Sequence, residues 1–223
     1  NPWDDRFTMS LLARSSLPNA ITIGRIILAP AIFFLICAPS YGARLLSFVL
    51  FLVAAFSDLW DGYLARKYGW ISNFGKLVDP IADKLLLVAT FVPIYVLSHR
   101  HWPGAEFPVW GELPLWVVLV IFGREVLITA IRSYAARRGV VIPAGPAGKR
   151  KAVWQNIFIG AALLWFALHT AAMQRGWSGA FWRFWQVLHG TVVSVTLAVA
   201  LVLTLYSLGI YLWSWRSLVR ETP

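Results

Sequence analysis

The fold of this chain is decided by residues 44–66, RLLSFVLFLVAAFSDLWDGYLAR, and residues 79–98, DPIADKLLLVATFVPIYVLS. Apolar side chains dominate both stretches, and each is close to the roughly 20 residues that a helix needs to cross a bilayer. A short polar segment separates them. The two stretches therefore predict a pair of antiparallel membrane-spanning helices joined by a short loop.

The rest of the chain continues this pattern. Of its 223 residues, 59% are hydrophobic and only 13% are charged, against roughly 25% charged residues in ordinary soluble domains. A soluble domain of this length could not bury so much apolar surface in one core. The apolar runs predict an all-α integral membrane protein of one domain, residues 1–223, with six spans at about 20–38, 44–66, 79–98, 113–136, 151–173 and 186–214. Residues 2–14 suit a short amphipathic helix on the membrane surface.

The basic residues give the orientation. An even number of spans puts both termini on one side, together with the second-to-third and fourth-to-fifth loops. That side carries Arg6, Arg14, Arg66, Lys67, Lys76, Arg137, Arg138, Lys149, Arg150, Lys151, Arg216 and Arg220. The other side carries Arg44, Arg100, Arg175 and Arg183. Cytoplasmic loops are the more basic ones, so we expect cytoplasmic termini. The same rule explains the net charge of +10 without a nucleic acid partner.

Four aspartates form the clearest chemical pattern. Asp58 and Asp61 are three residues apart near the end of the second predicted span, and Asp79 and Asp83 are four apart at the start of the third. Residues at these spacings share a helix face. Because the two helices are antiparallel, we expect the two pairs to meet near the cytoplasmic membrane surface.

Such a cluster favours metal binding. Each carboxylate costs roughly 2.5–3.5 kcal/mol deep in a bilayer, and the sequence places no matching set of basic residues nearby. Oxygen-only ligation favours a hard divalent cation, Mg²⁺ or Mn²⁺. Two such ions could clamp the attacking and leaving oxygens of a phosphoryl transfer. The alternative is a solvated charge cluster at the helix ends, which matched spacing on both helices disfavours.

Small and basic residues lie between the aspartates. Gly62, Ala65 and Gly75 would let a flat ring or a diphosphate approach the backbone, and Arg66 is a natural phosphate partner. Close helix packing is an equally good explanation for Gly62 on its own.

Residues 58–83, DLWDGYLARKYGWISNFGKLVDPIAD, resemble the signature of the CDP-alcohol phosphotransferase family, D-x2-D-G-x2-A-R-x8-G-x3-D-x3-D, at every fixed position. The resemblance implies a six-helix bundle, usually dimeric, with an active site open to the cytoplasmic leaflet of a bacterial inner membrane. It implies that Asp58, Asp61 and Asp79 are metal ligands and that Asp83 completes the site and is the base that deprotonates the acceptor hydroxyl. The residues implied to contact the CDP moiety are Gly62, Ala65, Arg66 and Gly75.

Three further stretches look like those of bacterial phosphatidylglycerophosphate synthases: LPNAITIGRIILAP (17–30), GREVLITAIRSYAARRG (123–139) and AGKRKAVWQN (147–156). That likeness implies CDP-diacylglycerol and glycerol 3-phosphate as substrates. We expect Arg124 and either Lys149 or Lys151 to bind the acceptor phosphate, with a smaller part for Arg132. The alternatives are an ion pair between Arg124 and Glu125 and a purely topological role for the basic residues 149–151.

Other functions stay open at this point. Within the family, the acceptor could be inositol phosphate, inositol, or phosphatidylglycerol as in cardiolipin synthesis. A cation transporter would use the carboxylates as an ion path, but it predicts acidic residues at mid-membrane on several helices. Here all four aspartates lie at one end of one hairpin.

Overall fold

The computed structural model describes the backbone of residues 2–68, 73–101, 104–107, 109–138 and 145–221. Within these ranges the side chains of residues 2–18, 61–66, 73–77, 146 and 214–221 are not described. The described part of the chain is helical, as the apolar runs predict. Its helices are α1 (Pro2–Cys37), α2 (Tyr41–Tyr68), α3 (Asn73–Ser98), α4 (Leu115–Arg137), α5 (Pro146–Arg175) and α6 (Ala180–Glu221).

Five segments of these helices are long and apolar enough to cross a membrane, counted over the described residues. They are Asn19–Cys37, Tyr41–Trp60, Val78–Ser98, Ala147–Arg175 and Ala180–Trp213. A multi-pass membrane protein is thereby confirmed. The remaining predicted span, 113–136, coincides with α4, in which Arg124, Glu125 and Arg132 lower the apolar character. Its crossing of the membrane stays a prediction.

The beginning of the chain differs in one respect from the sequence expectation. Residues 2–14 are not a separate helix, because α1 continues without a break from Pro2 to Cys37. A proline removes only one intrahelical hydrogen bond, and Pro18 does not end the helix. The position of residues 2–14 on a membrane surface stays a prediction.

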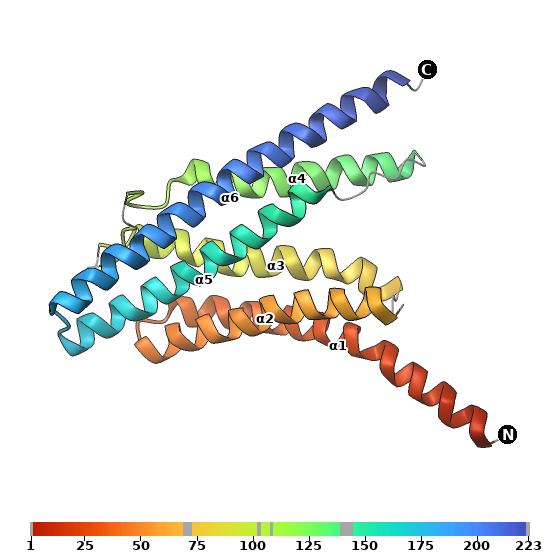
Figure 1. The fold of residues 1–223 in the computed structure, drawn as a ribbon, viewed down its shortest axis with the longest axis horizontal. Helices are drawn as coiled ribbons and strands as arrows, with labels where there is room; N and C mark the ends of the chain where they lie inside the picture. Colours follow the sequence, from red (N-terminus) through yellow and green to blue (C-terminus); the bar gives the residue numbers. More distant parts are fainter. Residues whose placement is uncertain (1, 69–72, 102–103, 108, 139–144, 222–223) are drawn as a thin grey trace. The chain divides into compact units, whose positions relative to one another are not determined.

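The helices gather into two compact units, Asn1–Ile94 and Tyr95–Pro223. In the first unit, α1 and α2 pack along each other, as Figure 1 shows for the red and orange helices. Ala29 and Ala54 are completely buried, and such small side chains let membrane helices approach closely. This packing places the middle of α1 beside the end of α2 that carries Asp58. The two compact units do not test whether residues 1–223 form one domain, so the single domain stays a prediction.

In the second unit, α6 packs against both α5 and α4. Figure 1 shows α5 and α6 running alongside each other after the turn at residues 176–179. Val193, Leu197 and Ala200 of α6 are buried, as are Ala162 and Leu163 of α5. This apolar contact extends along α6 and leaves its polar residues Thr204 and Ser207 facing inward, where both are buried.

The segment before α4 closes one end of the second unit. Phe107 is buried and its ring packs against those of Phe158 and Phe166, with centroids 6.2 and 5.3 Å away. Gly104 has a φ of +88° and lies against His169, where a Cβ atom would collide with the imidazole ring. The Trp165 indole donates to the Gly104 carbonyl at 3.1 Å. These contacts fix the segment onto α5.

Candidate active site

Three of the four predicted aspartates meet at one arginine that the sequence analysis did not include. Nη1 of Arg25 on α1 donates hydrogen bonds to Oδ1 of Asp58 and, at 2.8 Å, to Oδ1 of Asp83. Its Nη2 lies 3.7 Å from Oδ1 of Asp79. The expectation that the carboxylates of the hairpin come together is therefore met for these three residues. They are joined through a side chain of a third helix.

Local helix geometry explains the convergence. Asp79 and Asp83 are one turn apart on α3, so both side chains leave the same face. Thr22 and Arg25 are likewise one turn apart on α1, and the Thr22 hydroxyl donates to Asp79 at 2.6 Å. Asp58 comes from the last part of α2. Thus α1 and α3 each contribute a pair of polar residues one turn apart, and α2 contributes Asp58.

The arginine and the carboxylates differ in exposure. The Arg25 side chain is only 2% exposed, whereas those of Asp58, Asp79 and Asp83 are 40%, 49% and 58% exposed. The guanidinium therefore forms the floor of the cluster and the carboxylates form its rim. Three negative charges against one positive charge leave the rim with a surplus of negative charge, open to the surroundings.

The donor chemistry of this rim fits a hard divalent cation, because its ligands are carboxylate oxygens in excess of their counter-charge. Among the residues that the structure describes, no group of three or more His, Cys, Asp or Glu side chains is arranged so that it could hold a metal ion. Arg25 lies where the three described carboxylates meet. The fourth predicted ligand, Asp61, has a side chain outside the described residues.

The predicted CDP-binding residues also lie outside the described side chains: Gly62, Ala65 and Arg66 on α2, and Gly75 on α3. Only their places in the helices are known. Their roles stay predictions, as does the predicted placement of Asp61 on the face of Asp58.

Sequence reasoning missed Thr22 and Arg25, although a signal existed. An arginine inside an apolar span is expensive and marks a functional position by default. Arg25 lies within such a span and within the stretch 17–30 quoted above. The sequence analysis found no matching set of basic residues near the aspartates, and the structure adds one cation, Arg25 of α1, 33 positions before Asp58.

The second unit holds a buried charge cluster on α4, α5 and α6. Glu125 accepts hydrogen bonds from Arg124 at 2.9 Å and from Lys151 at 2.5 Å. The Nε of Arg124 also donates to the Ser207 hydroxyl at 3.2 Å. The side chains of Arg124 and Lys151 are 9% and 5% exposed. The structure thus brings these two predicted phosphate-binding cations together, and it also contains the Arg124–Glu125 ion pair.

The other two predicted cations lie apart from this cluster in the second unit. Arg132 donates to the Tyr211 hydroxyl of α6, and its guanidinium lies 5.4 Å from the centre of the Tyr211 ring. Lys149 is exposed at the start of α5. The sequence analysis offered Lys149 or Lys151 as the phosphate-binding lysine, and the structure groups Lys151 with Arg124.

A family model described as CDP-alcohol phosphatidyltransferase matches residues 15–218, nearly the whole chain and both compact units. The chain belongs to the CDP-alcohol phosphatidyltransferase family. The resemblance of residues 58–83 to that family's signature is thereby confirmed. Members of the family generally depend on a divalent cation, in keeping with the carboxylate rim.

Several curated bacterial relatives within this phosphatidyltransferase family are similar over most of their length. A CDP-diacylglycerol–glycerol-3-phosphate 3-phosphatidyltransferase of Bacillus subtilis is 36% identical over 161 residues, covering 67% of this chain and 76% of the relative. A probable phosphatidylglycerophosphate synthase of Mycobacterium tuberculosis is 36% identical over 167 residues, covering 71% and 72%. A relative from Mycoplasma pneumoniae, named as the Bacillus protein is, is 30% identical over 216 residues, covering 89% and 86%.

The position of Arg25 generates a prediction about stability. Arg25→Ala removes charge-assisted hydrogen bonds, each contributing about 1.5–3 kcal/mol, and leaves three carboxylates facing one another. We expect a lower Tm without metal, and a larger rise in Tm on adding Mg²⁺ or Mn²⁺ than in the unaltered protein. Thermal unfolding of the purified protein, with and without the cation, measures both.

Arg44→Ala is the matched control, since Arg44 is also a buried arginine of the first unit and donates to the Ala38 carbonyl. It should lower Tm without enlarging the response to the cation. Arg25→Lys keeps the charge and serves if the alanine variant does not fold. An equal cation response in the Arg25 and Arg44 variants would contradict this account of the cluster.

Proposed function

We propose that this protein transfers the phosphatidyl group of CDP-diacylglycerol to glycerol 3-phosphate, giving phosphatidylglycerol phosphate and CMP in phospholipid biosynthesis. The observation that carries the proposal is the convergence of Asp58, Asp79 and Asp83 in a rim of surplus negative charge. Family membership and relatives of that enzyme name at 30–36% identity support it.

The chemistry assigns distinct roles to the aspartates. The acceptor hydroxyl attacks the phosphorus nearest diacylglycerol, a new oxygen–phosphorus bond forms, and the bond to the bridging oxygen breaks. CMP leaves with that oxygen. Asp83 takes the hydroxyl proton, because an alcohol is a poor nucleophile at neutral pH until a base accepts its proton. Among the three described carboxylates, that of Asp83 is the most exposed, which suits contact with an arriving acceptor.

The metal ion, Mg²⁺ or Mn²⁺, would be held by Asp58, Asp61, Asp79 and Asp83. We propose that the site holds two such ions. Such cations supply charge neutralisation to the diphosphate and to the departing CMP. Arg25 would hold the ligand carboxylates in place from beneath, while Gly62, Ala65, Arg66 and Gly75 would contact the CDP moiety.

Arg124 and Lys151 would bind the phosphate of glycerol 3-phosphate. Their two positive charges share the single carboxylate of Glu125, so the cluster keeps a surplus positive charge for an anion. Inositol phosphate would also satisfy such a cluster. The names of the relatives favour glycerol 3-phosphate over inositol phosphate, inositol and phosphatidylglycerol.

The proposed setting is the inner membrane of a bacterium, with both termini and the active site on the cytoplasmic side, and a homodimer as the family resemblance implies. A cation transporter is the alternative from another class. It is disfavoured because the described acidic cluster lies at one end of the α2–α3 hairpin and is closed beneath by Arg25.

The carboxylate rim predicts a metal requirement. Activity should be lost in EDTA and restored by Mg²⁺ or Mn²⁺, and Asp58→Asn or Asp79→Asn should each abolish turnover, because losing one ligand charge weakens cation binding. CMP release from CDP-diacylglycerol is the measurement. Glu106→Gln, an exposed carboxylate of the second unit, is the control that should keep activity. Full turnover in a metal-stripped preparation would contradict the proposal of metal-assisted transfer.

The orientation can be tested by labelling. In a Cys37→Ser background, single cysteines at Lys67 or Lys149 should react with an impermeant maleimide only from the cytoplasmic side. A cysteine at Arg100 should react only from the outside. All three positions are exposed in the structure, so a lack of labelling reflects the membrane and not burial. The opposite pattern would place the aspartates on the side that lacks CDP-diacylglycerol.

The charge cluster predicts the acceptor. Loss of a charge-assisted contact costs about 1.5–3 kcal/mol, so Arg124→Ala or Lys151→Ala should lower kcat/KM for glycerol 3-phosphate about tenfold to a hundredfold. Binding of CDP-diacylglycerol should be unchanged, and Asp83→Asn should stop chemistry with both substrates still bound. Lys149→Ala, at an exposed cation, is the comparison and should cost less.

Steady-state kinetics with glycerol 3-phosphate, inositol phosphate, inositol and serine as competing acceptors provides the measurement. A clear preference for another acceptor would overturn the glycerol 3-phosphate assignment and leave the transferase assignment standing. An unchanged KM for glycerol 3-phosphate in both cation variants would remove Arg124 and Lys151 from the acceptor site.

A further inference from the structure

The guanidinium of Arg124 is held at two of its three nitrogens. Its Nη1 donates to the carboxylate of Glu125 on the same helix, α4, at 2.9 Å. Its Nε donates to the hydroxyl of Ser207 on α6 at 3.2 Å. A guanidinium is a rigid plane whose donors point in fixed directions. Hydrogen bonds from two of its nitrogens therefore also set the direction of the third, Nη2.

The third nitrogen points to the beginning of α5. A Cβ atom added to Gly148 would lie 3.4 Å from Nη2 of Arg124. Gly148 and Lys151 are three residues apart, so they share a face of α5. The Nζ of Lys151 donates to the same carboxylate oxygen of Glu125 that Arg124 contacts. The Nη2 group and the lysine therefore lie on the same side of the cluster, where one anion could contact both.

Ser207 is suited to hold Arg124 because of its own hydrogen bond. Its hydroxyl donates to the Thr204 carbonyl, three residues earlier on α6, at 3.0 Å. A hydroxyl has a single proton, so the oxygen of Ser207 presents its lone pairs to Arg124. The Ser207 side chain is buried where α6 packs against α4, and this burial shields the bond from competing water. The contact thus fixes an orientation as well as a distance.

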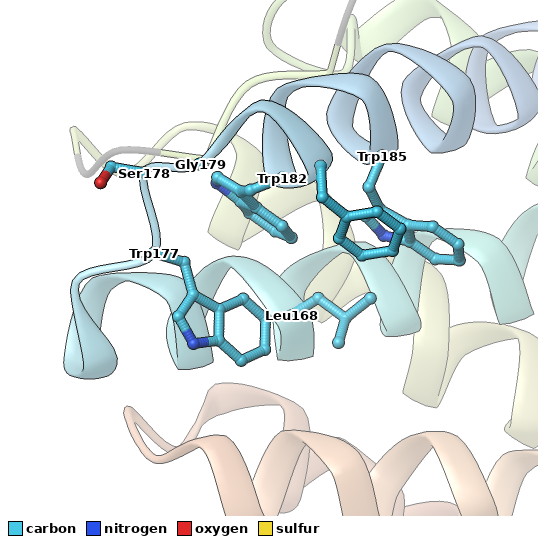
Figure 2. A pocket seen from close by; sticks show the side chains of 7 residues that line it. Leu168, Trp177, Ser178, Gly179, Trp182 and Trp185 are labelled. Atoms are coloured by element: carbon cyan, nitrogen blue, oxygen red, sulfur yellow. The ribbon is translucent and has the colours of Figure 1, made fainter.

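An apolar pocket of the same unit lies too far away to take part in this contact. It has a volume of about 640 Å³ where α5 ends and α6 begins. Figure 2 shows Leu168 and the indoles of Trp177, Trp182 and Trp185 around it. Leu168 is 17 residues after Lys151 on the continuous helix α5, which separates them by about 25 Å along the axis. An acceptor phosphate would therefore depend on the polar groups around Lys151, at the other end of this helix.

We propose that Ser207 is a positioning residue for the acceptor, because it holds the Arg124 guanidinium so that Nη2 is directed at the acceptor phosphate. This role rests on the proposed function, in which Arg124 and Lys151 bind that phosphate. Ser207 itself does not touch the substrate. Without its hydroxyl, Arg124 keeps its charge and its bond to Glu125 but gains rotational freedom. That freedom is lost again whenever an acceptor binds, so affinity for the acceptor falls and the chemical step is unchanged.

Variants of Ser207 that differ only in the hydroxyl test this role. Ser207→Ala removes the hydroxyl, and Ser207→Val and Ser207→Thr share one shape and differ in the hydroxyl alone. Ordering a mobile side chain costs about threefold to tenfold in affinity. Ser207→Ala should raise KM for glycerol 3-phosphate by about that factor, with kcat and KM for CDP-diacylglycerol unchanged. Ser207→Val should have a higher KM than Ser207→Thr by a similar factor. CMP release at varied concentrations of each substrate is the measurement.

Thr204→Val is the control from the same helix. Thr204 is also buried, and its hydroxyl donates to the Ala200 carbonyl of its own helix at 2.6 Å. The variant therefore loses a buried hydroxyl that does not hold Arg124, and KM for both substrates should stay unchanged. A double variant shows whether Ser207 acts through Arg124. In an Arg124→Ala background, Ser207→Ala should cause no further rise in KM for glycerol 3-phosphate.

The single variants separate two kinds of failure. If Arg124→Ala raises KM for glycerol 3-phosphate and Ser207→Ala does not, Ser207 is not a positioning residue and the proposed acceptor site stands. An equal rise in Thr204→Val, or effects of Arg124→Ala and Ser207→Ala that add in the double variant, would also remove the role of Ser207. If Arg124→Ala leaves KM unchanged, the proposed acceptor site is wrong and the role of Ser207 falls with it.

Discussion

The carboxylate cluster of the first unit depends on one buried guanidinium, that of Arg25. Arg25 is almost fully enclosed, and a charge so enclosed is stable only when it is paired and hydrogen-bonded. Its partners are carboxylates of α2 and α3, so the arginine fixes the ends of two helices against the middle of a third. Apolar packing alone could not do this, because lipid tails compete equally well for apolar helix faces. The ion cluster thereby gives the α2–α3 hairpin its register.

Both units use a shared partner to hold excess charge, with opposite sign. In the first unit one cation serves three carboxylates, and in the second one carboxylate, Glu125, serves Arg124 and Lys151. Each arrangement pairs its buried charge with groups of opposite sign and leaves a residual charge. In the proposed function, the residual negative charge would attract a metal cation and the residual positive charge would attract a phosphate. On the proposed function, the pairs that stabilise each cluster would therefore also provide its capacity to bind a ligand.

The parts of this structure that could be predicted from sequence are those that depend on local pattern. Long apolar runs predicted the helices, because a single apolar segment of about 20 residues satisfies its own backbone hydrogen bonds in a bilayer only as a helix. The spacing of Asp58, Asp79 and Asp83 predicted their convergence, since helix periodicity fixes faces. Arg25 was missed because its partnership depends on how α1 packs, and no spacing rule connects residues 33 positions apart. The continuity of α1 through Pro18 was missed for a related reason, since one lost hydrogen bond does not outweigh the rest of the helix.

The Glu125 cluster also bears on how an acceptor is selected. Arg124 and Lys151 are nearly buried and already paired, so a ligand must offer more than the carboxylate does in order to engage them. A neutral alcohol such as inositol offers no charge and would gain only ordinary hydrogen bonds from these groups. A phosphate offers more oxygens and more charge, and it can share the two cations with Glu125. If this cluster binds the acceptor as proposed, it would discriminate phosphorylated from neutral acceptors by charge, and the choice among phosphorylated acceptors would fall to the size and shape of the space around it.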